Sequence, residues 1–318
     1  MENMNKNLIE EAKAFDNRIS ERVKAGFIPD LRRAVKCEYF YKSFWRDPLF
    51  ISLYLGKINE GYLDLLNRHS KPSATILDVG CGAGYMSLEL ARNGYKVKAF
   101  DISSSSTKEA EDVLRDNPYL DGFGSLEYAV APLSEMTGKY DVVLFSVSLH
   151  HMTDMPGALD KAKSLLNEGG LLLCYEPCHD RWTEADAAQV TLIRGLLALT
   201  GRWYDPEEIQ TDLQDEEGLE KLTKEIHEEY VEERDKHESA QSPHDNEAEG
   251  GEMLDALRKR FTELETRSGH SFIYRLLGGI RASEEETQKI AEFIAAYDRF
   301  AVKNRYLNPN GFYFIGRK

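Results

Sequence analysis

The residues best suited to chemistry in this sequence follow two short apolar runs. Asp78-Val79-Gly80-Cys81-Gly82-Ala83-Gly84 closes the first run, and a helical pattern begins directly after it. A glycine-rich turn between a strand and a helix lets a ligand approach bare backbone at the helix N-terminus. Asp101 ends the next run, 17 residues after Gly84, where a carboxylate can accept hydrogen bonds from both hydroxyls of a ribose. Together the turn and the acid predict a site for a ribose-containing ligand.

The spacing of the glycines argues against a dinucleotide. Gly84 follows Gly82 by two residues, whereas the dinucleotide fingerprint places its third glycine three residues after the second, where Tyr85 stands. We therefore do not expect NAD to bind. Asp78 either contacts the ligand or fixes the loop, and the sequence leaves both interpretations open.

Two histidines follow the fourth apolar run. An imidazole with a pKa of about 6.5 can take a proton from a hydroxyl group, so His151, and after it His150, are candidate general bases. The alternative is that one of them hydrogen-bonds backbone and shapes the loop. Glu176 ends the fifth run at the same predicted edge of the sheet, where ligands bind in such folds. It could hold a substrate hydroxyl or amine, or cap a helix.

A metal site is not expected. Cys174, Cys178 and His179 lie close together in the sequence, but Cys174 falls in an apolar strand run and no matching second pair follows. Four cysteines in 318 residues do not form a disulfide framework, which favours a reducing compartment and a cytoplasmic location.

The elements that must position these residues alternate between strand and helix from residue 73 to residue 177, the pattern of a parallel sheet with helical crossovers. The pattern predicts strands at 75–79, 96–100, 126–130, 141–146 and 171–176, with helices at 86–93, 107–115 and 157–166. The sheet pattern then stops. It resumes with a helix at 252–258, a strand at 261–267, another helix and a closing strand at 311–317.

Two regions flank or interrupt this pattern. Residues 7–24 have the spacing of an amphipathic helix, and residues 47–68 form a second predicted helical stretch. Residues 182–203 carry an unusually broad apolar face, and residues 205–252 carry 19 acids against four basic side chains, which accounts for the whole net charge of −15. Because this insert leaves the sheet at the end of the fifth strand, we expect it to form a lid over an acceptor pocket. Without a basic stripe, nucleic acid is not an expected partner.

Taken together, these motifs resemble the class I S-adenosylmethionine-dependent methyltransferases, in particular the small-molecule branch that includes quinone and sugar methyltransferases. The resemblance covers residues 73–177, 252–267 and 311–318. It rests on Ile76–Gly84, on Asp101-Ile102-Ser103, on Tyr140–Leu144 running to His151, and on Leu165–Gly170 with Glu176-Pro177. It implies an α/β, Rossmann-like seven-stranded methyltransferase sheet, mostly parallel with the last strand antiparallel, with N-terminal helices and a helical lid insert.

The resemblance also implies roles for single residues. Gly80, Cys81 and Gly82 would cradle the methionine part of the cofactor, Asp101 would hold the ribose, Ile102 would pack on adenine, and Ser146 would border the sulfonium. After the third strand the family usually has Gly-Asp-Ala, whereas this chain has Ala131-Pro132-Leu133, so adenine recognition must use backbone there or Ser134. The predicted cofactor-binding residues are Asp78, Gly80, Cys81, Gly82, Gly84, Asp101, Ile102, Leu133 and Ser146.

An aromatic group before the core, with Tyr39, Tyr41 and Trp45, could fold over the cofactor, because aromatic faces attract a sulfonium cation. Arg46 could pair with a carboxylate. These four residues and Glu176 are the candidate substrate-binding residues. Ordinary packing and a surface arginine are the alternatives.

The sequence thus predicts three parts. Residues 1–72 form a helical segment that closes over the cofactor site, 73–178 and 251–318 form the methyltransferase core, and 179–250 form the acidic lid insert. The expected activity is transfer of a methyl group from S-adenosylmethionine to an oxygen, carbon or aliphatic nitrogen of a small molecule. A protein or RNA methyltransferase and a non-catalytic cofactor-binding protein are the alternatives. The apolar runs are too short for membrane insertion, and we expect a monomer or homodimer.

Overall fold

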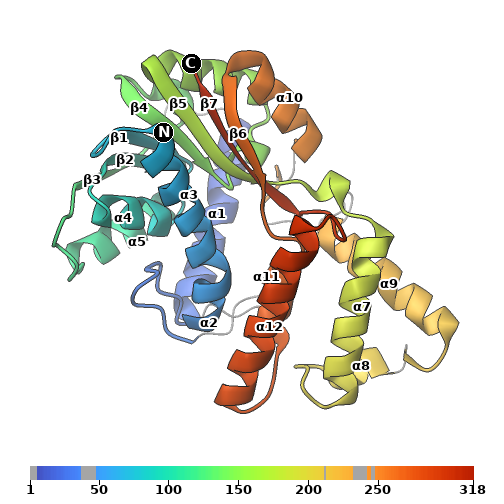
Figure 1. Cartoon of the computed structure of the whole chain (residues 1–318). Helices are drawn as coiled ribbons and strands as arrows, with labels where there is room; N and C mark the ends of the chain where they lie inside the picture. Colours follow the sequence, from blue (N-terminus) through green and yellow to red (C-terminus); the bar gives the residue numbers. More distant parts are fainter. Residues whose placement is uncertain (1–5, 37–47, 211–212, 232–241, 245–247) are drawn as a thin grey trace.

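The computed structural model describes residues 6–36, 48–210, 213–231, 242–244 and 248–318. A seven-stranded sheet with the order β3-β2-β1-β4-β5-β7-β6 forms its centre (Figure 1). The strands are β1 Thr75–Val79, β2 Lys96–Asp101, β3 Ser125–Val130, β4 Tyr140–Ser146, β5 Leu166–Pro177, β6 Thr262–Ser268 and β7 Gly311–Arg317. Strand β7 runs antiparallel to both of its neighbours, and the pairs among β1 to β5 are parallel. This topology confirms the predicted fold class.

Helices cover both faces of the sheet, which is why its central strands are apolar at almost every position. Successive strand residues point to opposite faces. In β1, Ile76 belongs to an apolar cluster with residues of α3 and α4, whereas Leu77 belongs to a second cluster with residues of α6 and α10. The covering helices are α3 Gly56–His69, α4 Tyr85–Arg92, α5 Ser104–Arg115, α6 Met155–Leu165 and α10 Gly250–Arg260.

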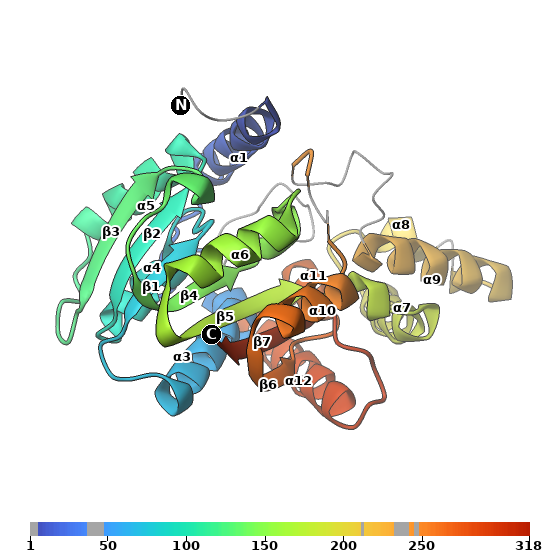
Figure 2. The same cartoon turned by 90° about the horizontal axis from the view of Figure 1, so that it is seen from above.

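The N-terminal segment places a helix beside the site end of the sheet. Helix α1, Lys6–Lys24, matches the helix predicted at 7–24, and Asp16 fixes it to α5 by accepting hydrogen bonds from the Ser103 hydroxyl (2.6 Å) and the Ser105 N–H (2.9 Å). Figure 2 shows α1 next to α5. The helix predicted at 47–68 consists of α2 Pro48–Phe50, a π-helical turn η1 Ile51–Leu55, and α3.

The insert leaves β5 through the short turn η4 His179–Arg181 and forms α7 Glu184–Leu199, α8 Pro206–Gln210 and α9 Glu216–Val231. It packs against α11 Ile273–Leu276 and α12 Glu284–Lys303, which lie between β6 and β7. Tyr204 N–H donates to Gly279 O, and Asp186 accepts from Asn308. The sequence-based division assigned all of 251–318 to the core, whereas residues 269–310 pack with the insert as one helical layer.

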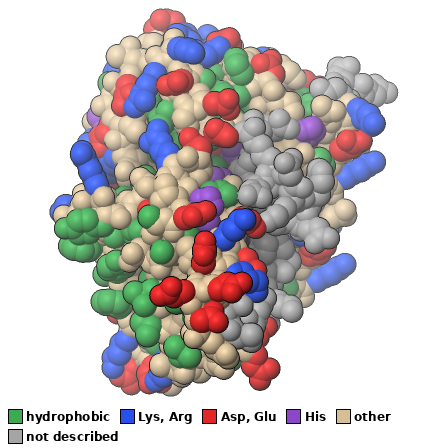
Figure 3. Space-filling model, turned by 90° about the vertical axis from the view of Figure 1, so that its right-hand side faces the viewer, with side chains coloured by type: hydrophobic (Ala, Val, Ile, Leu, Met, Phe, Trp, Pro, Cys, Tyr) green, Lys and Arg blue, Asp and Glu red, His purple; other side chains and the backbone are tan. Residues whose placement is uncertain are grey.

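The broad apolar face of α7 is only partly covered. Val190 and Leu197 are buried. The side chains of Leu192, Leu196 and Leu199 on the same helix are 57–63% exposed. The face that the insert presents carries acidic side chains across its centre and hydrophobic ones along one edge (Figure 3).

Candidate functional site

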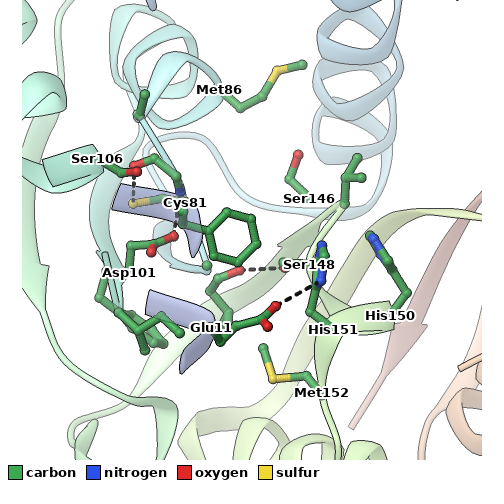
Figure 4. Close-up of a pocket in the computed structure, with 18 of the residues that line it drawn as sticks. Glu11, Cys81, Met86, Asp101, Ser106, Ser146, Ser148, His150, His151 and Met152 are labelled. Atoms are coloured by element: carbon green, nitrogen blue, oxygen red, sulfur yellow. Dashed lines mark hydrogen bonds and ion pairs between the residues drawn. The ribbon is translucent and has the colours of Figure 1, made fainter. Parts of the chain in front are cut away.

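A cavity of about 670 Å³ lies at the carboxyl ends of β1, β2, β4 and β5. Ligands bind at this edge in sheets of this kind. Helix α1 supplies one wall, the glycine turn after β1 a second, and the loop after β4 a third (Figure 4). The cavity continues past Ser146 to side chains of η1 and α11, so one space joins the predicted cofactor site to a second, aromatic end.

The glycine turn has the conformation that its residue types require. Gly80 and Gly82 have φ angles of +69° and +53°, which L side chains rarely adopt. A Cβ atom at Gly82 would meet no atom within 4 Å, so the turn offers open cavity there. The Gly82 N–H donates to the carboxylate of Asp101 (2.7 Å), which ties the turn to the end of β2. The turn is therefore a preformed cradle of bare backbone.

Asp101 is 8% exposed and lines the cavity. Its second oxygen accepts from the Ser103 N–H (2.8 Å), and burial raises the pKa of the carboxyl. Ile102 and Leu133 line the same end of the cavity. Ser146 lines it farther along and accepts a hydrogen bond from the Tyr62 hydroxyl (2.9 Å). Open backbone after β1 and a carboxylate at the end of the neighbouring strand β2 fit a nucleoside with a short charged tail.

Asp78 and Gly84 lie behind this cradle and do not line the cavity. Asp78 is 1% exposed, accepts from the Ser87 hydroxyl of α4 (2.5 Å), and has its pKa raised by burial to about 7. A Cβ at Gly84 would overlap the ring of Tyr128. Of the two interpretations of Asp78, its placement favours the one in which it fixes the loop.

Glu176 holds the loop after β4. Its side chain is fully buried and one oxygen accepts from the N–H groups of Ser148 (3.0 Å) and Leu149 (2.9 Å). The other oxygen lies 2.8 Å from His150 Nδ1. Glu176 does not line the cavity, so its placement favours the capping alternative over contact with a substrate.

His151 faces the cavity and meets α1. Its Nδ1 lies 3.3 Å from Glu11 Oε1, and its ring contacts Phe15 edge-on with centroids 5.3 Å apart. Glu11 is a functional candidate that our sequence reasoning missed. Its signal was an acid on the apolar face of α1, at helical spacing from Leu8 and Phe15.

The second end of the cavity was also missed. Tyr54, Tyr274, Arg275 and Asn310 line it from three separate segments of the chain. The predicted substrate residues Tyr39, Tyr41, Trp45 and Arg46 lie outside the described residues.

Cys174, Cys178 and His179 do not converge. Cys174 is buried in β5, and the Cys178 thiol donates to the Pro309 carbonyl (3.2 Å). In the part of the chain that the structure describes, no three metal-ligating side chains gather, and none of its helices is long and apolar enough to span a membrane.

A family model described as a methyltransferase domain matches residues 54–225, more than half of the chain. The chain belongs to this methyltransferase family. Among curated relatives, magnesium protoporphyrin IX methyltransferase of Arabidopsis thaliana is 32% identical over 116 residues, 36% of each chain. Ubiquinone biosynthesis O-methyltransferase of Xylella fastidiosa is 31% identical over 140 residues, 42% of this chain and 54% of that one.

Ribosomal protein L11 methyltransferase of Macrococcus caseolyticus is 34% identical over 116 residues, 35% of this chain and 34% of the relative. The chain thus spans about a third to a half of the length of the curated relatives it matches. Among solved structures, magnesium protoporphyrin IX methyltransferase from Synechocystis with bound SAH has a TM-score of 0.52 at 13% identity, covering 99% of this chain and 100% of the other. This similarity supports the same overall fold along the full length of both chains.

Proposed function

We propose that this protein transfers the methyl group of S-adenosylmethionine to an oxygen, carbon or aliphatic nitrogen of a small-molecule acceptor. The observation that carries the proposal is the single cavity that joins the glycine cradle and Asp101 to an aromatic end near Tyr54 and Tyr274. A donor and an acceptor held in one enclosed space can react without release of either into water.

The cofactor half of the proposal rests on three parts of the cavity wall. Gly80 and Gly82 would offer backbone to the methionine part, Asp101 would accept from the ribose hydroxyls, and Ile102 with Leu133 would enclose the adenine. S-adenosylmethionine, when bound, supplies an electrophilic methyl group on its sulfonium. The chain's own contribution is to align this end with the acceptor end and to exclude water between them.

The acceptor half rests on the loop after β4. His151 lines the cavity between its two ends, where a neutral imidazole can take the proton of an acceptor hydroxyl or amine as the new bond forms. Positioning supplies most of the acceleration in this proposal, and one base adds about 10²–10⁴-fold. A cavity walled by α1, η1 and α11 favours a small acceptor over a folded protein surface.

Calorimetry with S-adenosylhomocysteine tests the cofactor site. We expect Asp101→Ala to weaken binding at least tenfold, because hydrogen bonds to a charged group contribute about 1.5–3 kcal/mol each. The exposed Asp121→Ala is the matched control and should bind as the wild type does. Equal affinity of the Asp101 variant would remove this residue from the site.

The acceptor class is tested with methyl-labelled S-adenosylmethionine and a panel of small phenols, carboxylic acids and aliphatic amines beside a basic peptide. Label in a small molecule that depends on His151 supports the proposal. Label in the peptide alone would favour the protein methyltransferase alternative.

A further inference from the structure

Glu11 joins three parts of the chain that lie far apart in the sequence. From α1, its Oε1 accepts a hydrogen bond from the Ser242 hydroxyl (2.5 Å) and lies 3.3 Å from Nδ1 of His151. Its Oε2 accepts from the His244 N–H (3.1 Å). Glu11 is 4% exposed, so the three contacts are largely shielded from bulk solvent. One carboxylate thus fixes α1 and residues 242–244 to the loop after β4.

The surroundings keep this carboxylate charged. Burial raises the pKa of Glu11, but the hydrogen bonds from His151 and Ser242 outweigh burial and leave the pKa below its usual value. A buried charge of this kind needs partners that donate protons to it. A neutral imidazole has one N–H, and the carboxylate beside Nδ1 favours the tautomer that carries the proton there. The lone pair then remains on Nε2.

We propose that Glu11 is a positioning residue that holds His151 with its proton on Nδ1, and that it does so only while α1 covers the cavity and residues 242–244 hold the Glu11 carboxylate. The inference rests on the proposed role of His151 as the base. Leu8 and Phe15 of the same helix line the cavity. Helix α1, which would enclose the cofactor, therefore also supplies the carboxylate that orients His151. Removal of a proton by His151 is thus coupled to the closed position of α1.

The charged and titratable groups around His151 come from several elements. Glu11 faces it from α1, Asp101 acts on it from the end of β2, and the ring of His150 lies 4.1 Å away between centroids. Glu176 contacts His150 from β5. The carboxylate of Glu11 is in direct contact with the His151 ring, as Figure 4 shows. Its removal should change the tautomer of His151 more than any distant charge does.

Nitrogen NMR of the full-length protein with ¹⁵N-labelled histidine tests the proposal, with S-adenosylhomocysteine added. The His151 signals are assigned by their loss in His151→Gln. We expect the wild type to carry the Nδ1 proton, and Glu11→Gln to mix the tautomers and to lower the His151 pKa by about one unit, since an opposite charge in contact shifts a pKa by 1–3 units. Glu10→Gln, one residue away and solvent-facing with Lys6, is the matched control and should leave both unchanged.

A wild-type spectrum with the His151 proton on Nε2 would overturn the proposal without any variant. So would a Glu11→Gln spectrum that matches the wild type while the variant still binds S-adenosylhomocysteine. Glu11→Asp provides the conservative variant if the glutamine change unfolds α1, and it should retain the Nδ1 tautomer. Failure of the wild type to bind S-adenosylhomocysteine would instead contradict the proposed function, because the tautomer can be measured without it.

Discussion

Two adjacent histidines in this protein each meet a carboxylate, but the two pairs are built differently. His150 contacts Glu176 at 2.8 Å, and both belong to the sheet region, since β4 and β5 are neighbouring strands. His151 contacts Glu11 at 3.3 Å, and this acid comes from a helix outside the sheet. Side-chain exposure is 4% for His150 and 13% for His151. Both histidines line the cavity, but Glu176 lies behind the cavity wall whereas Glu11 is part of it.

This difference separates two uses of one chemical pair. Glu176 also accepts from the backbone N–H groups of Ser148, Leu149 and His150, so its pair with His150 defines the path of the loop. Glu11 belongs to α1, which lines the cavity, and accepts from Ser242 and His244, so its pair with His151 forms when α1 and residues 242–244 are in place. The first pair should matter for stability and the second for turnover.

The largest effect is expected from Glu176→Ala. The change leaves several buried donors without an acceptor and should destabilise the fold by about 3–5 kcal/mol, because each buried donor left unsatisfied costs about 1–3 kcal/mol. Urea unfolding measures it. Glu168→Ala changes an acid of the same strand whose side chain is 92% exposed, and it should leave the midpoint nearly unchanged. Equal midpoints for the two variants would contradict the assigned role of Glu176.

A smaller effect, on turnover alone, is expected from His151→Gln. Methyl transfer should fall about 10²-fold while affinity for S-adenosylhomocysteine stays near the wild-type value, because a base acts in the transition state. His150→Gln is the comparison, and it should reduce thermal stability instead. A large loss of turnover in a stable His150 variant would move the base to that neighbour.

The smallest effect is expected on the pH dependence of stability, where a third histidine, His270, can be compared with His150 and His151. His270 is buried, its Nδ1 finds no hydrogen-bond partner among the described residues, and burial lowers its pKa to about 4. The folded state therefore binds fewer protons than the unfolded state between pH 6.5 and pH 4, and stability falls as the pH falls through this window. Between pH 7 and pH 5, the wild type should lose about 2 kcal/mol more than His270→Phe. Parallel stability curves would show that the pKa of His270 is the same in the folded and unfolded states, and would contradict the effect of burial.

The strands and the glycine turn could be predicted because a sheet covered on both faces leaves apolar runs in the sequence. Strand β5 begins at Leu166, five residues before the predicted start, because Asn167, Glu168 and two glycines interrupt the apolar pattern. The register shift between β4 and β5 falls in the same stretch. Two hydrogen bonds hold this polar segment in the sheet: Lys318 N–H donates to the Gly170 carbonyl, and the Asn167 amide donates to Asp141. Both partners lie far from the segment in the sequence.

The parts of the site that could not be predicted depend on contacts between distant segments. Glu11 contacts His151 although 140 positions separate the two residues in the sequence. Tyr274 lines the cavity from α11, in the connection between the edge strand β6 and β7. Periodicity reports which face of a helix is buried but not what it is buried against. The sequence predicted that Glu176 is an acid at the end of the fifth strand. It could not predict that the side chain points toward the loop after β4, because that depends on how the backbone of Ser148 and Leu149 is folded.

Helix α1 buries only Glu11 and Ile19 of its 19 residues, although it walls the cavity. Local opening of an element with so few buried side chains costs far less free energy than unfolding of the sheet. Such an element can open by local unfolding while the strands stay paired. Exchange of product for fresh cofactor would then pass through the opening of this helix.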